Sequence, residues 1–205
     1  MPRLGRDDAP TSRRAAPAAP AAAPLRHRDA ARFILDQARA AVETVDDFDV
    51  ERLVDLIQQA GNVIVFGRGR SGFVGRGFTV RLMHLGVPAY FVGETVTPPV
   101  RQDDLVIVIS GSGETFSVVV TAQTAKDLGC RIVTITGNPD STLARLSDQV
   151  VLLRTPTGDR QRALAPLGTV FETSSMIFLD GLIADLMATS GATEESMRSR
   201  HATLE

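Results

Sequence analysis

The sequence predicts an α/β fold, a three-layer α-β-α sandwich built on a five-stranded parallel sheet, with extra helices before the first strand. From about residue 63 onward, short apolar runs alternate with helical stretches, as in strands joined by crossover helices. Each run is apolar on both faces, which is typical of strands that helices cover above and below. Glycine-rich loops follow the first and third runs, where ligands bind in such sheets.

The N-terminal region divides near residue 26. Residues 1–26 are dense in Ala, Pro and Arg without apolar periodicity, and such a segment buries too little surface to offset its ordering entropy. We therefore expect a disordered Ala/Pro-rich tail. Residues 27–205 are expected to form one domain with N-terminal helices and a C-terminal tail, because 205 residues with 43% hydrophobic content suit a single core.

Two helices are predicted before the sheet. Apolar residues recur at three- and four-residue spacing from Phe33 to Val45, which indicates a helix that begins near Arg28. A second helix is predicted from about Val50 to Ala60, and Gly61 fits as its C-terminal stop.

The strands and their connections follow in order. Strands are expected at residues 63–66, 89–92, 105–109, 132–136 and 149–153, and helices at residues 71–85, 115–128, 141–147 and 170–189. Residues 93–103 contain Pro98 and Pro99 without a helical period, so they are predicted to be a loop. Residues 191–205 are expected to form a polar C-terminal tail.

Composition excludes several classes of protein. No apolar run approaches the length that spans a bilayer, and a net charge of −2 gives no overall attraction to nucleic acid. The lone Cys130 allows no intramolecular disulfide, and the start at Met1 lacks the apolar core of a secretory signal. We therefore expect a cytoplasmic protein that binds neither membrane nor nucleic acid.

The first glycine loop, residues 67–72, satisfies the pattern G-x-G-x-x-G directly before a helix. Taken alone, this favours a dinucleotide such as NAD, with Glu94 after the second strand as the acid that binds the ribose. The pattern is weak, because Arg70 and Ser71 stand where the turn approaches a ligand. Glycines that only make a tight turn remain the other interpretation.

The second loop, residues 110–115, reads Ser-Gly-Ser-Gly-Glu-Thr and opens a helix. Hydroxyl groups there join the unpaired N–H groups and the positive dipole at a helix N-terminus, which is a place for a phosphate. Both glycine loops follow strands of one sheet, so they are expected to face one small phosphorylated molecule. A sugar phosphate is favoured over NAD.

These loops carry a resemblance to a known family. The order of strands and loops resembles the sugar isomerase (SIS) domain, a flavodoxin-like arrangement, and within that group the 6-phospho-3-hexuloisomerases. Phe116 and the Pro-Leu-Gly sequence of residues 166–168 depart from the usual pattern. The stretches that carry the resemblance are Arg81 to Gly86, Val92 to Pro98, Ile109 to Thr115, Phe171-Glu172 and Arg200 to Glu205.

The resemblance implies a reaction. A base removes the proton from C2 of 3-hexulose 6-phosphate (D-arabino-hex-3-ulose 6-phosphate), and the resulting enediolate is protonated at C3 to give fructose 6-phosphate. This isomerisation belongs to the ribulose monophosphate pathway of formaldehyde fixation. A sensing SIS module that regulates a partner, or an SIS isomerase for another sugar phosphate, is the alternative function.

The resemblance also implies site residues. The phosphate is expected on Ser110, Ser112 and Thr115, and the sugar chain on Ser71 and Arg70. Glu172 is expected to be the catalytic base, although an acid near a helix start can also serve only the helix dipole.

Two histidines and one further acid complete the expected site. His84 and His201 are expected to be catalytic, and His201 to reach the site of a neighbouring subunit. His84 also fits a hydrogen-bonded core residue. Glu94 is expected either to line the pocket or to fix the Gly93 loop.

No cofactor is implied, and no metal, because the three histidines show no ligand spacing. The expected partners are a small sugar phosphate and further copies of this chain in a homotetramer built from dimers. A pathway link to hexulose-6-phosphate synthase is also expected.

Overall fold

The computed structural model describes residues 26–204. The tail predicted for residues 1–26 therefore lies, apart from Arg26, outside the described residues. The helices are α1 (His27–Val42), α2 (Asp47–Gln59), α3 (Gly69–Leu85), α4 (Phe116–Asp127), α5 (Thr142–Leu146), α6 (Asp159–Leu164), α7 (Thr169–Ser190) and α8 (Glu194–Arg198). The strands are β1 (Val63–Gly67), β2 (Ala89–Phe91), β3 (Leu105–Ile109), β4 (Arg131–Thr136) and β5 (Gln149–Leu152).

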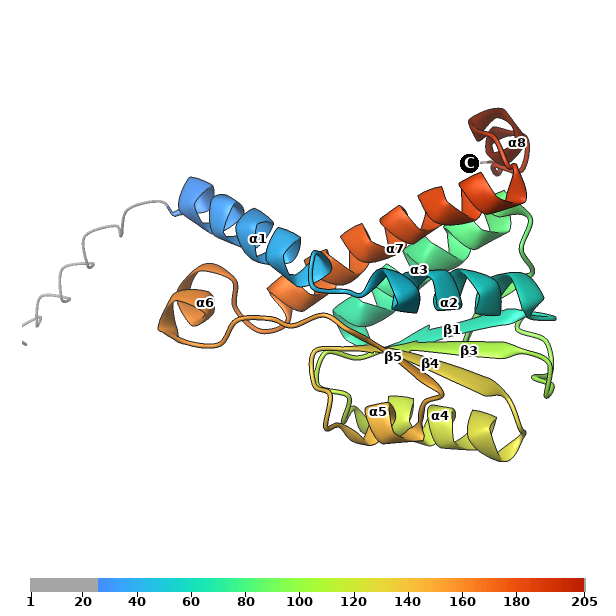
Figure 1. The fold of residues 1–205 in the computed structure, drawn as a ribbon, viewed down its shortest axis with the longest axis horizontal. Helices are drawn as coiled ribbons and strands as arrows, with labels where there is room; N and C mark the ends of the chain where they lie inside the picture. Colours follow the sequence, from blue (N-terminus) through green and yellow to red (C-terminus); the bar gives the residue numbers. More distant parts are fainter. Residues whose placement is uncertain (1–25, 205) are drawn as a thin grey trace, which may run out of the picture.

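One five-stranded parallel sheet forms the centre, with the strand order β2-β1-β3-β4-β5. All five residues of β1 and all five of β3 are buried, which explains why these strands are apolar throughout. Helices α4 and α5 lie on one side of the sheet, and α2, α3 and α7 on the other (Figure 1). The predicted fold class is confirmed.

Helix α1 projects from the body of the molecule beside the start of α7, with α6 below it (Figure 1). Phe33 of α1 packs with Ala165 and Val170 in a small cluster separate from the main core. This cluster fixes the turn between α6 and α7.

The structure adds two short helices that the sequence did not predict. Helix α6 has no buried residue, and α8 has only Met197, so neither shows a strong apolar period. The C-terminal segment is thus partly helical: a capping box between Thr193 and Ser196 begins α8. Helix α2 begins three residues earlier than expected, because Asp46 accepts a hydrogen bond from the Phe48 N–H and caps the helix.

Within residues 26–204, no helix combines the length and the apolar character needed to cross a membrane.

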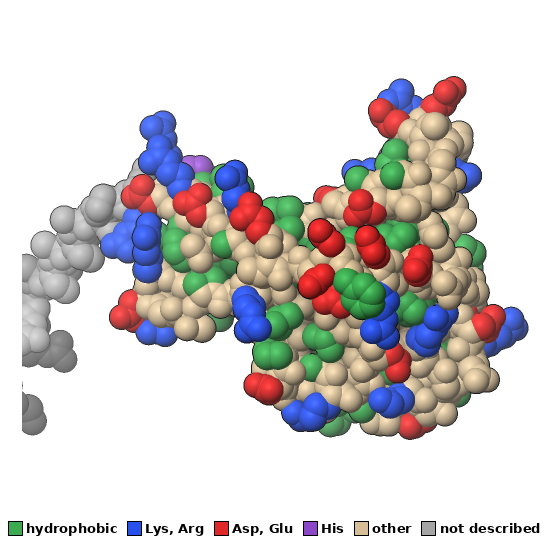
Figure 2. Space-filling view, in the orientation of Figure 1, with side chains coloured by type: hydrophobic (Ala, Val, Ile, Leu, Met, Phe, Trp, Pro, Cys, Tyr) green, Lys and Arg blue, Asp and Glu red, His purple; other side chains and the backbone are tan. Residues whose placement is uncertain are grey.

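Acidic side chains gather over α2 in the view of Figure 2. One hollow there is lined by Asp47, Glu51, Asp55 and Asp185.

Candidate active site

The two glycine loops lie at the point where the strand order reverses. Strand β1 has β2 on one side and β3 on the other, and Gly67 at the end of β1 pairs with Ile109 at the end of β3. The connections that follow β1 and β3 therefore leave adjacent positions at the carboxyl edge of the sheet. This is where ligands bind in open parallel sheets.

The glycines of the first loop serve close packing. A Cβ atom on Gly67 would lie 3.0 Å from the carbonyl oxygen of Ile109, and one on Gly72 would lie 2.8 Å from the oxygen of Gly67. A side chain at Gly72 would therefore collide with the backbone, and one at Gly67 would have very little room. The loop delivers Arg70 and Ser71 to the first turn of α3.

Hydroxyl groups converge within the serine loop. Ser110 is buried, and its Oγ lies 3.2 Å from the Oγ1 of Thr115 and accepts a hydrogen bond from the Gly113 N–H. Ser112 accepts a hydrogen bond from the Glu114 N–H. Thr115 is the N-cap of α4, but its side chain makes no capping bond. The start of α4 thus keeps donors for an anion.

Residues 138–143, which follow β4, hold the serine loop by hydrogen bonds. The Asn138 side chain donates to the Ser112 carbonyl, and the Leu143 N–H donates to the Gly113 carbonyl. The Glu114 carboxylate accepts a 2.7 Å hydrogen bond from the Thr142 N–H, which lowers the pKa of Glu114. No role was predicted for Glu114 from the sequence, because its hydrogen-bond partner stands 28 residues further along the chain.

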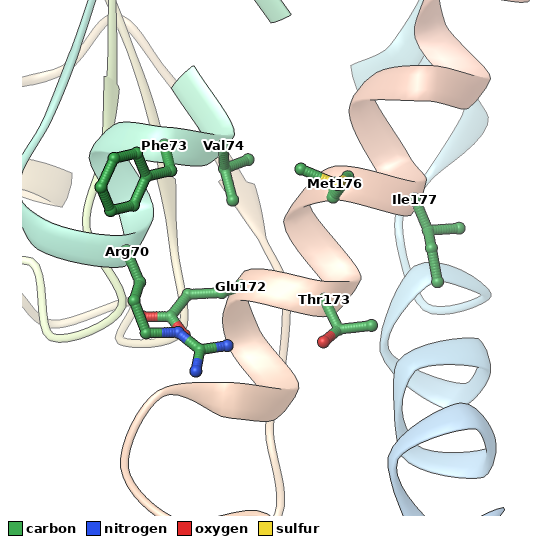
Figure 3. Close-up of a pocket in the computed structure, with 7 residues that line it drawn as sticks. All are labelled: Arg70, Phe73, Val74, Glu172, Thr173, Met176 and Ile177. Carbon is green, nitrogen blue, oxygen red and sulfur yellow. The ribbon is translucent and has the colours of Figure 1, made fainter. Parts of the chain in front are cut away.

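Glu172 and Arg70 meet across two helices. Glu172 lies in the first turn of α7, and its Oε2 is 2.5 Å from the Nε of Arg70 in α3. The Glu172 side chain is 13% exposed and that of Arg70 is 63% exposed, so Arg70 is the partner that faces solvent. Figure 3 shows the two side chains meeting from α7 and α3. The guanidinium of Arg70 and the carboxylate of Glu172 form an ion pair whose alignment is not that of a hydrogen bond. Among the described residues, no donor forms a hydrogen bond to Glu172 Oε2.

Phe171 connects this pair to the serine loop. A Cβ atom on Gly111 would lie 3.0 Å from the Phe171 ring, so the start of α7 rests directly against the loop that is expected to bind phosphate. Glu172 is the next residue. The structure therefore brings together the first turns of α3 and α7 and the serine loop, as the sequence interpretation requires.

A hollow of about 470 Å³ extends from the Arg70–Glu172 pair along α3 and α7 (Figure 3). Its other walls are Phe73, Val74, Thr173, Met176 and Ile177. Phe73 is 69% exposed, and the serine loop contributes none of these residues. The walls are mainly apolar, which suits a protein surface better than a sugar phosphate.

Glu94 is held by Arg76. Its Oε1 accepts a 2.9 Å hydrogen bond from the Arg76 Nε, and the Arg76 guanidinium lies over the Phe91 ring, 4.2 Å from the centroid. Thr97 closes the turn by donating to the carbonyls of Phe91 and Glu94. These contacts favour loop fixing over substrate contact as the role of Glu94.

The two expected histidines lie together, but far from Glu172 in the same chain. His84 is 6% exposed near the end of α3, and its ring stacks on that of His201 with centroids 5.2 Å apart. Burial, and then the charges of His201 and Arg81, lower the pKa of His84. At 1.5 Å per residue, His84 stands about 21 Å along α3 from Arg70.

Among residues 26–204, no group of three His, Cys, Asp or Glu side chains is arranged to hold a metal ion.

Phe116, one of the departures from the family pattern, is 81% exposed at the first position of α4. It therefore stands beside the serine loop without being packed into the core.

The chain is similar to several known proteins. A family model described as the SIS domain matches residues 56–179. A 3-hexulose-6-phosphate isomerase of Methanocaldococcus jannaschii is 41% identical over 158 residues, which cover 76% of this chain and 83% of the relative. One of Bacillus subtilis is 35% identical over 176 residues, which cover 84% of this chain and 95% of the relative.

A solved structure is similar as well. It is the crystal structure of a Methanococcus jannaschii protein for which a molecular function of 3-hexulose-6-phosphate isomerase was inferred. Its TM-score is 0.76 at 37% identity, and the match covers 88% of this chain and all of the other.

Proposed function

The chain belongs to the SIS domain family, and we propose that it is an isomerase that interconverts 3-hexulose 6-phosphate and fructose 6-phosphate. The resemblance found in the sequence is thereby confirmed at the level of the family. We assign the reaction to the ribulose monophosphate pathway, in the cytoplasm.

One observation carries the proposal. The serine loop, which is suited to a phosphate, touches the start of α7 through Gly111 and Phe171, and the next residue, Glu172, is paired with Arg70. A phosphate anchor, a carboxylate and a cation therefore lie at one edge of the sheet. An isomerase that works through an enediolate needs these three groups.

The phosphate binds at the start of α4. Ser110 and Thr115 exchange the contact between their hydroxyl groups for bonds to the phosphate oxygens, and Ser112 exchanges its bond from the Glu114 N–H. The N–H groups at the helix start and the helix dipole stabilise the dianion. This anchor fixes the sugar chain relative to Glu172.

Glu172 removes the proton from C2, next to the C3 carbonyl, and returns it to C3, while a proton passes from O2 to O3. The resulting C2–C3 enediolate carries negative charge on oxygen. Arg70 is exposed and lies 2.5 Å from Glu172, so its guanidinium is placed to leave the carboxylate and bind that oxygen. Ser71, in the same turn of α3, binds a hydroxyl of the sugar.

A second copy of the chain supplies the histidines. His84 and His201 lie at one end of α3 and Arg70 at the other, and the exposed apolar residues Phe73 and Val80 lie between them on α3. Two α3 helices that pack antiparallel about a twofold axis bring the His84 end of one copy to the Arg70 end of the other. This pairing gives the dimer from which the proposed tetramer is built.

A coupled assay tests the function. Ribulose 5-phosphate, formaldehyde and a separate hexulose-6-phosphate synthase generate the substrate, and phosphoglucose isomerase with glucose-6-phosphate dehydrogenase reports fructose 6-phosphate as NADPH. We expect a rate that depends on this protein and is unchanged by EDTA. A folded oligomer that binds fructose 6-phosphate but gives no NADPH would contradict the proposal and favour a sensing module.

A further inference from the structure

Leu167 has a backbone conformation that leucine rarely adopts. Its φ is +57°, and it is the one residue other than glycine with a positive φ among residues 26–204. Leucine lacks the short polar side chain that lets Asn or Asp tolerate this region. Its side chain is also 94% exposed, so packing of Leu167 against the protein does not compensate for the strain.

Neighbouring groups hold the strained turn. The Gln161 side chain in α6 donates hydrogen bonds of 2.7 Å to the Ala165 carbonyl and 3.1 Å to the Leu167 carbonyl. The Thr169 hydroxyl donates to the Pro166 carbonyl at 2.7 Å. The conformation is therefore fixed from both sides, as is typical of strain that is kept for function.

The turn also lies against the proposed base. The Gly168 carbonyl accepts a hydrogen bond from the Glu172 N–H at 2.9 Å. A Cβ atom on Gly168 would lie 2.9 Å from the Glu172 Oε1, so the backbone beside Leu167 contacts the carboxylate. The exposed leucine is one residue from that contact.

We propose that Leu167 covers the bound sugar chain beside Glu172, and that Gln161 is the positioning residue that holds it there. This inference rests on the proposed function. An apolar cover excludes water from the enediolate and strengthens the attraction between its oxygen and Arg70. Helix α6 thereby acquires a role in the reaction although none of its residues belongs to the core.

Three substitutions separate bulk from strain. Leu167→Ala removes the cover and keeps the strain, Leu167→Gly removes both, and Leu167→Met keeps the cover. We expect kcat/KM to fall about tenfold in Leu167→Ala and Leu167→Gly, because both lose the contact with the sugar chain. In Leu167→Met, kcat/KM should stay near the wild-type value. Leu35→Ala, at another exposed leucine, is the control. Leu167→Gly is expected to melt about 2–4 °C above Leu167→Ala.

Gln161→Met tests the brace, because methionine has a similar length but no donor. We expect Gln161→Met to lower kcat/KM, as Leu167→Ala does. Wild-type kinetics in Leu167→Ala and Leu167→Gly would overturn the inference. So would a change in molar mass by light scattering, since Leu167 would then contact another copy of the chain.

Binding keeps this test separate from the test of the function. Calorimetry with fructose 6-phosphate and with inorganic phosphate needs no turnover. We expect Leu167→Ala to weaken fructose 6-phosphate about tenfold and to leave phosphate unchanged, even if the coupled assay is silent. Equal affinities of wild type and variant for fructose 6-phosphate would overturn the role of Leu167 alone, whereas no binding by wild type would overturn the proposed function and the role of Leu167 with it.

Discussion

At the scale of single residues, the site depends on contacts between side chains that are far apart in the sequence. Arg70 and Glu172 are separated by about a hundred positions, yet their charged atoms lie 2.5 Å apart. Gly111 and Phe171 are in contact although about sixty positions separate them. Each pair joins a loop or helix start at the carboxyl edge of the sheet to the start of α7.

Glu172→Gln tests the base. Glutamine keeps the size of the side chain but cannot accept the C2 proton, so turnover in the coupled assay should fall about 10²- to 10⁴-fold. Binding of inorganic phosphate, measured by calorimetry, should persist because the serine loop is intact. Glu51→Gln, at an exposed position of α2, is the matched control. Unchanged turnover in Glu172→Gln would remove this residue from the mechanism.

Gly113→Ala tests the shape of the serine loop. Gly113 has a φ of +66°, and its added Cβ would collide with the Ser141 side chain. We expect a loss of about 1–3 kcal/mol in the free energy of unfolding, together with weaker binding of phosphate. Gly181→Ala is the control, because Gly181 lies within α7 with nothing within 4 Å of the new methyl group.

The control should behave in the opposite way. Alanine in a helix interior is about 0.5–1 kcal/mol more stable than glycine, so Gly181→Ala should raise the midpoint of urea unfolding and leave phosphate binding unchanged. A Gly113→Ala variant as stable as wild type would show that the loop adapts to the methyl group.

At the scale of elements, α3 connects two distinct places. Its first turn carries Arg70, and its last turn carries His84, which stacks on His201. Arg200 follows α8 and donates to the His84 carbonyl at 3.2 Å. A cation at a helix C-terminus is favourable, so α8 and Arg200 fasten the C-terminal segment to the end of α3.

The protonation of His84 predicts a dependence of stability on pH. Because the folded chain lowers the pKa of His84 from 6.5, the unfolded chain binds the proton more readily. The stability that neutral His84 contributes to the folded chain is therefore fully present above pH 6.5. It is lost as the pH falls towards the pKa of His84 in the folded state.

Urea unfolding at pH 7.5, 6.0 and 5.0 measures this effect. His84→Gln should lose part of the fall in stability that wild type shows towards pH 5.0, because glutamine does not titrate. His27→Gln, at an exposed position at the start of α1, should keep the wild-type dependence. Identical slopes in His84→Gln and wild type would contradict the assignment.

The elements were predictable where burial alone determines them. The apolar runs of β1 and β3 are buried on both faces, so composition identifies them as strands. Helix α8 was missed because only Met197 packs on the core, and a single apolar residue has no period. The serine loop was found from local chemistry. The stacking of His84 on His201 was not, because only the folded chain brings them together.

At the scale of the whole molecule, an apolar surface remains open along α3 and α7. Five of its residues are between 40% and 69% exposed: Phe73, Val80, Met83, Met176 and Ile177. Apolar patches of this kind mark protein contacts. The surface begins at the Arg70–Glu172 pair, so a second copy that covers it also borders the proposed site.

Phe73→Glu tests the assembly. A charge on this surface should disfavour association through α3. Light scattering at micromolar concentration should therefore give a mass of at most two chains of 21.9 kDa, where wild type gives about four. Turnover should fall with the mass, because the histidines of the second copy are lost. Phe48→Glu is the matched control: Phe48 is 67% exposed on α2, against 69% for Phe73. A monomeric wild type would contradict the tetramer.

Helix α7 covers one side of the sheet with Phe178, Leu179 and Leu182, yet it follows all five strands in the chain. During synthesis at 5–20 residues per second, roughly 2–8 s separate the end of β5 from the end of α7. Throughout that interval, the nascent chain carries the apolar residues of a complete parallel sheet without their largest cover. The ribosome-bound intermediate therefore exposes apolar surface that the complete chain buries, and such surface favours aggregation before synthesis ends.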